Sequence, residues 1–167
     1  ILAPQPYMKN ILENIFKIKK NFTGSSLKFL ELNKNFEIYK IFEAISEFNK
    51  YSEIRYVGGC VRKILNNENV DDIDLATNVG PSDVINCLKK KEIKFYETGI
   101  EHGTVTAQIN KKNFEITTLR KDLTTDGRHA VVQFSNDWAG DASRRDFTIN
   151  AIYADKDGNL FDPSTEK

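Results

Sequence analysis

A short stretch of this sequence places glycines, an arginine and two aspartates in an order that suits phosphate chemistry. Gly58 and Gly59 follow an apolar run, and Arg62 follows them on an expected helix. Glycines let backbone N–H groups approach an anion, and an arginine can grip phosphate oxygens with paired hydrogen bonds. Asp72 and Asp74 come next, and residues two apart in a strand point to one face. Two carboxylates aimed together need a cation, usually Mg²⁺ beside phosphates, so the stretch predicts a metal-dependent nucleotide site.

Two other places in the sequence can complete such a site. Glu115 begins an expected strand and is either a third carboxylate of the site or a glutamate exposed at a sheet edge, and the sequence leaves both interpretations open. Arg144, Arg145 and Asp146 fall within one helical turn. Arginines neutralise phosphate and an aspartate can accept a hydrogen bond from a ribose hydroxyl, so this cluster suits a nucleotide. The alternative is a set of salt bridges within the helix.

Short apolar runs separated by turn residues indicate the elements that must position these side chains. The expected helices are 36–49, a short one after Gly59, 81–91 and 141–150, and the expected strands are 54–57, 70–76, 93–97, 104–109, 114–119 and 151–154. Short strands mixed with helices predict a sheet-centred α/β or α+β domain. Residues 21–35 and 122–140 contain glycines and polar clusters, which indicates loops, the second long enough to serve as a lid.

The N-terminal part differs from the rest in its pattern. Residues 8–20 have apolar residues at helical spacing with lysines on the other face, which predicts an amphipathic helix docked on the protein. We therefore expect residues 1–35 to form an extension and residues 36–167 to form the main domain. The chain starts at Ile1 without a methionine, so we expect a fragment or a start with added residues.

Composition limits what the chain binds and where it works. It has 167 residues, 40% of them hydrophobic, enough for one core, and its 24 basic residues balance 24 acidic ones. Without a net attraction to nucleic acid, RNA affinity must come from a local patch or from outside this chain. Cys60 and Cys87 lack a C-x-x-C partner, which favours buried thiols over a disulfide or a zinc site. No apolar run approaches the ~20 residues of a membrane helix, so we expect no membrane contact and a cytoplasmic protein.

Five motifs occur in the order seen in class II tRNA nucleotidyltransferases, the CCA-adding enzymes, and in the related bacterial poly(A) polymerases. They are Gly58-Gly59-Cys60-Val61-Arg62, Asp72-Ile73-Asp74-Leu75-Ala76-Thr77, His102-Gly103-Thr104, Glu115-Ile116-Thr117-Thr118-Leu119-Arg120 and Arg144-Arg145-Asp146-Phe147-Thr148-Ile149-Asn150-Ala151. From residue 54 to its end, the chain resembles the head domain of this family. The resemblance implies a nucleotidyltransferase head of the DNA polymerase β type, a mixed sheet of about five strands flanked by helices.

The resemblance also implies roles for the candidate residues. The region 122–140 would be the mobile loop that these enzymes use in switching from C to A addition. The metal-binding catalytic pair would be Asp72 and Asp74 with Mg²⁺, the triphosphate would be held by Gly59 and Arg62, and the nucleotide by Arg145 and Asp146, with Asp146 sensing the ribose.

Two departures from the family pattern are visible. Lys63 stands where the family usually has an acidic residue, which affects a local helix contact. The chain stops soon after Asp162-Pro163, so the family's neck, which selects the incoming base, and its RNA-holding body and tail fall outside it. The resemblance therefore implies a catalytic head whose grip on RNA is supplied by regions outside this chain.

The leading hypothesis is a metal-dependent enzyme that adds CMP and AMP, from CTP and ATP, to the tRNA 3′ end and releases pyrophosphate. A first alternative keeps the chemistry and changes the product: a poly(A) polymerase, or an enzyme adding only C or only A. A second alternative is a nucleotide-binding domain that is inactive without the missing RNA-binding part.

Overall fold

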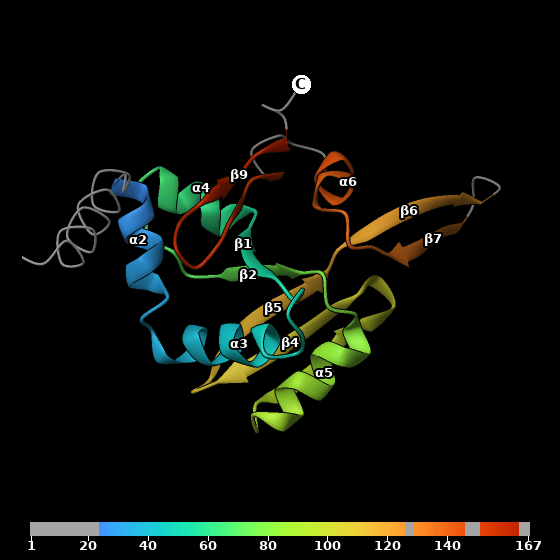
Figure 1. Cartoon of the computed structure of the whole chain (residues 1–167), viewed down its shortest axis with the longest axis horizontal. Helices are drawn as coiled ribbons and strands as arrows, with labels where there is room; N and C mark the ends of the chain where they lie inside the picture. Colours follow the sequence, from blue (N-terminus) through green and yellow to red (C-terminus); the bar gives the residue numbers. More distant parts are fainter. Residues whose placement is uncertain (1–23, 126–128, 146–150, 164–167) are drawn as a thin grey trace, which may run out of the picture.

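A single mixed sheet forms the centre of the molecule. The structure, a computed structural model, describes residues 24–125, 129–145 and 151–163. In these ranges seven strands pair in the order β3-β4-β5-β2-β1-β8-β9, with β2 and β5 parallel and the other pairs antiparallel (Figure 1). The predicted fold class is confirmed. The predicted strand 151–154 contains β8, and the sheet has one strand more than the six expected because β9 has only two residues and leaves little trace in the sequence. The bounds are β1 Ile54–Val57, β2 Ile73–Thr77, β3 Lys94–Gly99, β4 Thr104–Ile109, β5 Lys112–Thr118, β8 Tyr153–Ala154 and β9 Leu160–Phe161.

Three helices pack on one face of this sheet and build the main core. In α3 the apolar stripe is buried as its spacing predicts, with Ile41 and Ile45 fully covered. Asn35 caps this helix, because its side chain accepts a hydrogen bond from the Glu37 backbone N–H at 3.0 Å. The helices of this face are α3 Phe36–Ser46, α4 Gly59–Leu65 and α5 Pro81–Lys90, and α6 Trp138–Ser143 contributes to the opposite face.

The opposite face of the sheet carries a smaller apolar cluster with polar residues beside it. Successive strand residues point to opposite faces, so Leu75 belongs to the main core and Ala76 to the smaller cluster. Trp138 of α6 and Tyr153 of β8 meet there edge to face, with ring centroids 5.1 Å apart. This contact fastens α6 to the face of the sheet that also carries Asp74.

Residues 21–35, predicted as a loop, contain a helix instead. Helix α2 runs Gly24–Leu32. Phe29 is fully buried, and its ring lies 5.5 Å from that of Tyr56 in the sheet. The prediction was wrong because the Gly-Ser-Ser start of the helix resembles a turn, whereas contacts with the rest of the fold stabilise it. The amphipathic helix predicted over residues 8–20 lies outside the described residues.

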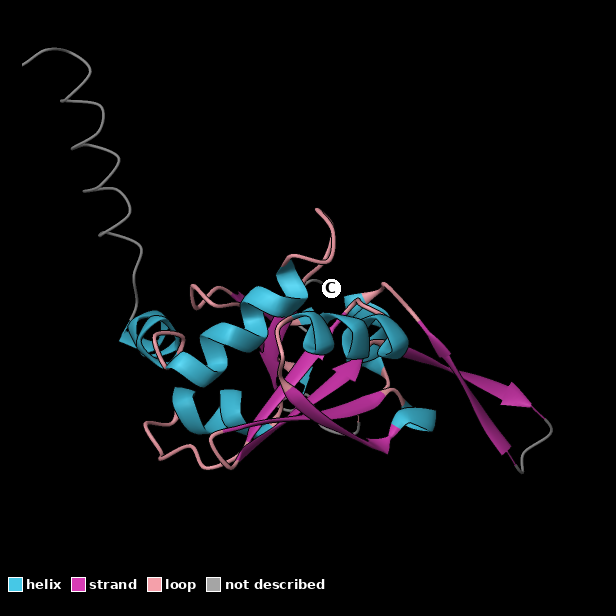
Figure 2. Cartoon of the chain, turned by 90° about the horizontal axis from the view of Figure 1, so that it is seen from below, coloured by secondary structure: helices cyan, strands magenta, loops and turns pink. Residues whose placement is uncertain are grey.

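Residues 122–140, predicted as one long exposed loop, include most of a β-hairpin and the start of α6. Strands β6 (Arg120–Thr125) and β7 (His129–Phe134) pair antiparallel, with Asp122 opposite Val132. This β6–β7 hairpin extends away from the sheet (Figure 1 and Figure 2). The prediction was wrong because the two strands pair their backbone groups with each other, apart from the main sheet, and the described apolar residues Leu123 and Phe134 are exposed.

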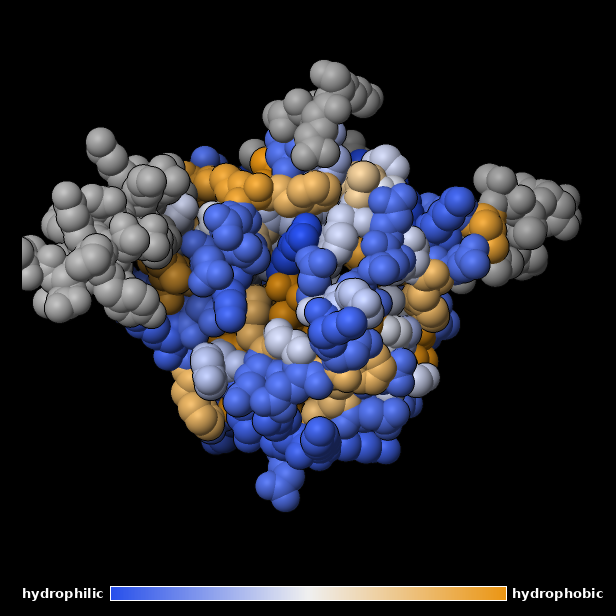
Figure 3. All heavy atoms as spheres, viewed as in Figure 1, coloured by the Kyte–Doolittle hydropathy of each residue, from blue (hydrophilic) through white to orange (hydrophobic). Residues whose placement is uncertain are grey.

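In the view of Figure 3, apolar side chains form patches among hydrophilic ones. Of the helices that the structure describes, none has both the length and the apolar character needed to cross a bilayer. Cys60 and Cys87 are both buried free thiols, as predicted.

We expect Gly158→Ala to destabilise the fold, because the β8–β9 turn presses against α2. Gly158 has a φ of +81°, and a Cβ there would lie 2.5 Å from Ser26 Cα. A left-handed backbone costs alanine about 1–2 kcal/mol, and the clash adds to this. The free energy of unfolding in urea should therefore fall by about 2 kcal/mol or more. Gly24→Ala, whose Cβ would meet nothing within 4 Å, is the control. Equal losses in the two variants would contradict the docking of α2.

Candidate active site

The carboxylates of Asp74 and Glu115 lie side by side, because β2 and β5 pair in parallel with these residues in register. Their neighbours Leu75 and Ile116 point into the main core, so both acidic side chains point to the open face. Asp74 is half-buried and Glu115 is exposed. Burial raises the pKa of Asp74, and the negative charges of Glu115 and Asp72 raise it further. The structure therefore brings Glu115 next to the predicted catalytic pair.

Asp72 lies just outside the strand on which it was predicted. Strand β2 begins at Ile73 instead of residue 70, and Asp72 is exposed directly before it. Its charge nevertheless contributes to the raised pKa of Asp74. Asp72 therefore acts on Asp74 from the irregular segment that enters β2, outside the paired strand on which it was predicted.

Gly58 and Gly59 form the entry into α4, directly after β1. Gly58 has a φ of +73°, which suits glycine, and the Arg62 Nη2 atom lies 3.9 Å from the position of a Cβ on Gly59. The guanidinium thus lies over the glycine backbone, and within the described ranges no carboxylate forms an ion pair with it. The Cys60 thiol lies 3.6 Å from the backbone oxygen of Asp74, and this contact keeps the start of α4 beside β2.

Arg145 reaches the site from the end of α6, where Asp141 holds it. The Nε and Nη2 atoms of Arg145 each lie 3.2 Å from Asp141 Oδ2, and the Arg145 charge opposes the rise in the pKa of Asp74. Arg144 contacts the other oxygen of Asp141 at 3.7 Å. Arg144 and Arg145 therefore both form salt bridges with Asp141, and Arg145 also interacts through its charge with Asp74. Asp146 lies outside the described residues.

Asp141 and Tyr153 are neighbours of the site that sequence reasoning missed. Asp141 is 1% exposed and accepts a 2.6 Å hydrogen bond from the Tyr153 hydroxyl. Burial and this hydrogen bond raise the pKa of Tyr153. One signal was available, namely the position of Asp141 four residues before Arg145, a spacing at which helical side chains meet. Nothing in the sequence indicates that Tyr153 contacts Asp141, because Tyr153 belongs to strand β8 and not to this helix.

The acidic residues fit a hard divalent cation. Such ions prefer carboxylate oxygens, and the pKa of Asp74 is raised first by burial and then by the negative charges of Glu115 and Asp72, which a cation would relieve. Across the part of the chain that the structure describes, no three His, Cys, Asp or Glu side chains form a ready-made metal cage. An ion that keeps several waters and also binds substrate phosphates, as Mg²⁺ does, suits such a partial set of ligands.

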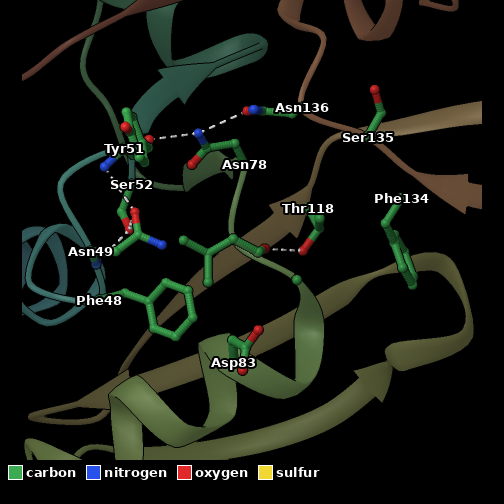
Figure 4. Close-up of a pocket in the computed structure, with 12 residues that line it drawn as sticks. Phe48, Asn49, Tyr51, Ser52, Asn78, Asp83, Thr118, Phe134, Ser135 and Asn136 are labelled. Carbon is green, nitrogen blue, oxygen red and sulfur yellow. Dashed lines mark hydrogen bonds between the residues drawn. The ribbon is translucent and has the colours of Figure 1, made fainter.

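A separate cavity of about 500 Å³ lies at the other end of β2 (Figure 4). Residues of the α3–β1 loop, the start of α5 and the end of β7 line it, and none of the predicted site residues does. On its wall, Asn78 Nδ2 donates to the Tyr51 carbonyl at 2.8 Å and to Asn136 Oδ1 at 2.9 Å. These bonds tie the base of the β6–β7 hairpin to the sheet. The acidic residues lie elsewhere, on the open face of the sheet.

Comparisons with known proteins match this geometry to one family. The family model described as "Poly A polymerase head domain" matches residues 54–165. The human mitochondrial CCA tRNA nucleotidyltransferase 1 is 49% identical over 111 residues, which are 66% of this chain and 26% of that protein. A CCA-adding enzyme of Oceanobacillus iheyensis is 41% identical over 109 residues, which are 64% of this chain and 26% of that protein. The crystal structure of the Bacillus stearothermophilus CCA-adding enzyme in complex with CTP matches with a TM-score of 0.62 and 30% identity, over 85% of this chain and 30% of that one. The chain thus spans about a quarter of the length of these curated relatives.

Asp74→Asn should raise the free energy of unfolding near neutral pH, because it removes a half-buried charge that two others crowd. The raised pKa means that the folded protein holds this proton more tightly than the unfolded chain does. The contribution of Asp74 to stability therefore falls as the pH rises above the unfolded pKa of about 3.9. In urea unfolding the variant should be the more stable protein at neutral pH, and the difference should close below about pH 4. A less stable variant at neutral pH would show that the ionised carboxylate stabilises the fold.

Proposed function

The chain belongs to the poly(A) polymerase head domain family, and we propose that it is the catalytic head of an RNA nucleotidyltransferase that adds CCA to tRNA 3′ ends. The observation that carries the proposal is that Asp74 and Glu115 lie side by side on one open sheet face, with the charges of Asp72 and Arg145 acting on Asp74. The similarity to human CCA tRNA nucleotidyltransferase 1 supports tRNA as the acceptor. The CTP in the related Bacillus stearothermophilus complex supports a nucleoside triphosphate as the donor.

In the proposed reaction the 3′-hydroxyl oxygen of the RNA attacks the α-phosphorus of CTP or ATP. A new P–O bond forms while the bond to pyrophosphate breaks, and the hydroxyl proton passes to water. Asp72 and Asp74 hold Mg²⁺, which when bound supplies a Lewis acid at the reacting phosphate. Glu115, exposed beside Asp74, adds a third negative charge that favours the cation at this place.

The basic residues of the site hold the nucleotide. Gly58 and Gly59 offer backbone groups that a phosphate can approach closely, and the Arg62 guanidinium lies over them as a fork donor. Arg145 neutralises further phosphate charge from the end of α6. Asp146 accepts the hydrogen bond from the ribose hydroxyl. These groups recognise features that CTP and ATP share, so they do not by themselves select the base.

Base selection and the grip on tRNA belong to parts of the protein outside this chain. The 24 basic residues only balance the 24 acidic ones, and the chain spans about a quarter of its curated relatives. A protein that binds long RNA through its phosphates is usually basic. We therefore expect weak and unselective transfer from these 167 residues alone.

The description of the matching family model points to a second candidate product, a poly(A) tract. Because the matching model is a poly(A) polymerase head, the same site could serve the repeated addition of AMP. The two activities share the attack on the α-phosphorus and differ in the bases added. Sequencing the extended 3′ ends after incubation with CTP and ATP together separates them: a terminal CCA supports tRNA maturation, and an A tract supports polyadenylation.

Alanine at both Asp72 and Asp74 should abolish transfer, because no side chain is left to hold the cation against the phosphate. In the full-length protein that carries this head, the rate should fall by about a thousandfold or more. The measurement is the incorporation of labelled CMP and AMP into a tRNA transcript that lacks its CCA end. Asp83→Ala, which removes an aspartate of α5 away from the site, is the matched control, and a chelator should reproduce the loss. Unimpaired extension by the double variant would refute the proposed function.

A further inference from the structure

We propose that Asp141 is a positioning residue, which holds Arg145 away from the catalytic aspartates so that this arginine serves the nucleotide and leaves the metal site free. The inference deepens the proposed function and rests on it. Arg145 interacts with acidic groups on two sides, with Asp141 by direct ion pairing and with Asp74 through its charge. Which of the two carboxylates Arg145 pairs with therefore decides whether Asp74 is available to a cation.

Asp141 has the contacts that such a role needs. Its side chain is 1% exposed, and partners from three elements reach its two oxygens. Oδ2 accepts from the Tyr153 hydroxyl at 2.6 Å and from Arg145 Nε at 3.2 Å, and Oδ1 accepts from the Arg120 backbone N–H at 3.1 Å. A buried carboxylate with this many donors has a fixed position, so the arginine that it binds is fixed as well.

The charge of Asp141 matters more than its shape, because arginines crowd around it. Arg144 and Arg145 both form ion pairs with Asp141. The pKa of Arg120 is lowered, first by burial and then by the positive charge of Arg144, so Arg120 lies near them. Without the negative charge these guanidiniums would repel one another. Arg145 would then be free to pair with another carboxylate, and its charge already acts on the crowded Asp74.

The same carboxylate links Arg145 to the β6–β7 hairpin. Arg120 is the first residue of β6, and its backbone N–H is bound to Asp141. The Ser135 N–H donates to the Leu119 carbonyl at 2.8 Å and closes the base of the hairpin beside this point. A shift of the hairpin base would therefore move the anchor of Arg145, and a lost anchor would loosen the base.

Asp141→Asn keeps an oxygen for Tyr153 and for the Arg120 N–H but removes the charge, so it tests the proposal directly. Calorimetric titration with Mg²⁺ alone and with CTP plus Mg²⁺ should show both affinities falling about tenfold or more, the scale of a lost charged hydrogen bond. Asp83→Asn, the same substitution away from the site, should leave both unchanged. Amide hydrogen exchange over residues 120–125 should quicken in Asp141→Asn, because the hairpin base has lost its anchor.

A rescue experiment separates positioning from general damage. In the double variant Asp141→Asn, Arg145→Gln no guanidinium is left to occupy Asp74, so Mg²⁺ affinity should return to within about threefold of the unchanged protein while CTP binding stays weak. A merely structural role predicts no return. Should Asp141→Asn fail to fold, Tyr153→Phe keeps the charge, removes the 2.6 Å bond and should weaken Mg²⁺ binding about two- to tenfold. Arg145→Gln added to it should again restore that binding.

The outcomes distinguish this inference from the proposed function. If the unchanged protein binds Mg²⁺ and CTP, and Asp141→Asn binds both equally well, the positioning role is overturned and the proposed function stands. Failure of Arg145→Gln to restore Mg²⁺ binding overturns the positioning role too. If the unchanged protein binds neither Mg²⁺ nor CTP, the proposed function is overturned and the inference with it.

Discussion

Negative charge crowded around Asp74 is the interaction on which the arrangement of the site depends. The parallel pairing of β2 with β5 sets Glu115 beside Asp74, and Asp72, in the segment that enters β2, adds its negative charge. Such a group of like charges costs free energy of folding, since burial and repulsion both disfavour the ionised form. The alternate residues of the same strands offset this cost: Leu75 and Ile116 are buried on the other face against the helices. The register of the β2–β5 pair therefore places apolar residues in the core and acidic residues on the open face.

The positive side of the site is organised by a second, smaller core. Trp138 and Tyr153 pack edge to face and fix α6 against the sheet, and the Arg55 guanidinium lies 4.1 Å from the centre of the Trp138 ring. Next to this contact Asp141 forms ion pairs with Arg144 and Arg145, and the charge of Arg145 still acts on Asp74. Arg145 and Asp74 thus interact through their charges while Arg145 forms its ion pair with Asp141. The proposed binding of both a cation and a triphosphate would need this separation.

The predictable part of the structure is the part whose sequence pattern reports burial. Strands β1 and β4 were predicted with their observed bounds, and α5 to within one residue, because apolar alternation and a proline start mark them. Helix α2 was missed because Phe29 is held by a contact with Tyr56 that lies far along the chain. The β6–β7 hairpin was missed because its strands pair with each other, apart from the main sheet, and its described apolar residues Leu123 and Phe134 are exposed.

The same reasoning explains what could be predicted of the site. Asp72, Asp74, Gly59 and Arg62 fall within one short stretch, so spacing alone could bring them together, and Glu115 needed only the pairing of two strands. Asp141 could not be assigned, because its importance comes from Tyr153 and from the Arg120 backbone, which no local pattern connects. Residues that act by holding other residues leave the weakest signal in a sequence.

The most direct measurement is the effect of Mg²⁺ on the free energy of unfolding of the unchanged protein and of the double variant Asp72→Asn, Asp74→Asn. A cation that binds only the folded protein adds RT ln(1 + [L]/Kd), about 2.7 kcal/mol at a hundredfold excess over Kd. Crowded carboxylates that a cation relieves predict a clear Mg²⁺-dependent rise in the unchanged protein and none in the variant. An equal response of the two proteins would contradict the assignment of Asp72 and Asp74 as the metal-binding pair.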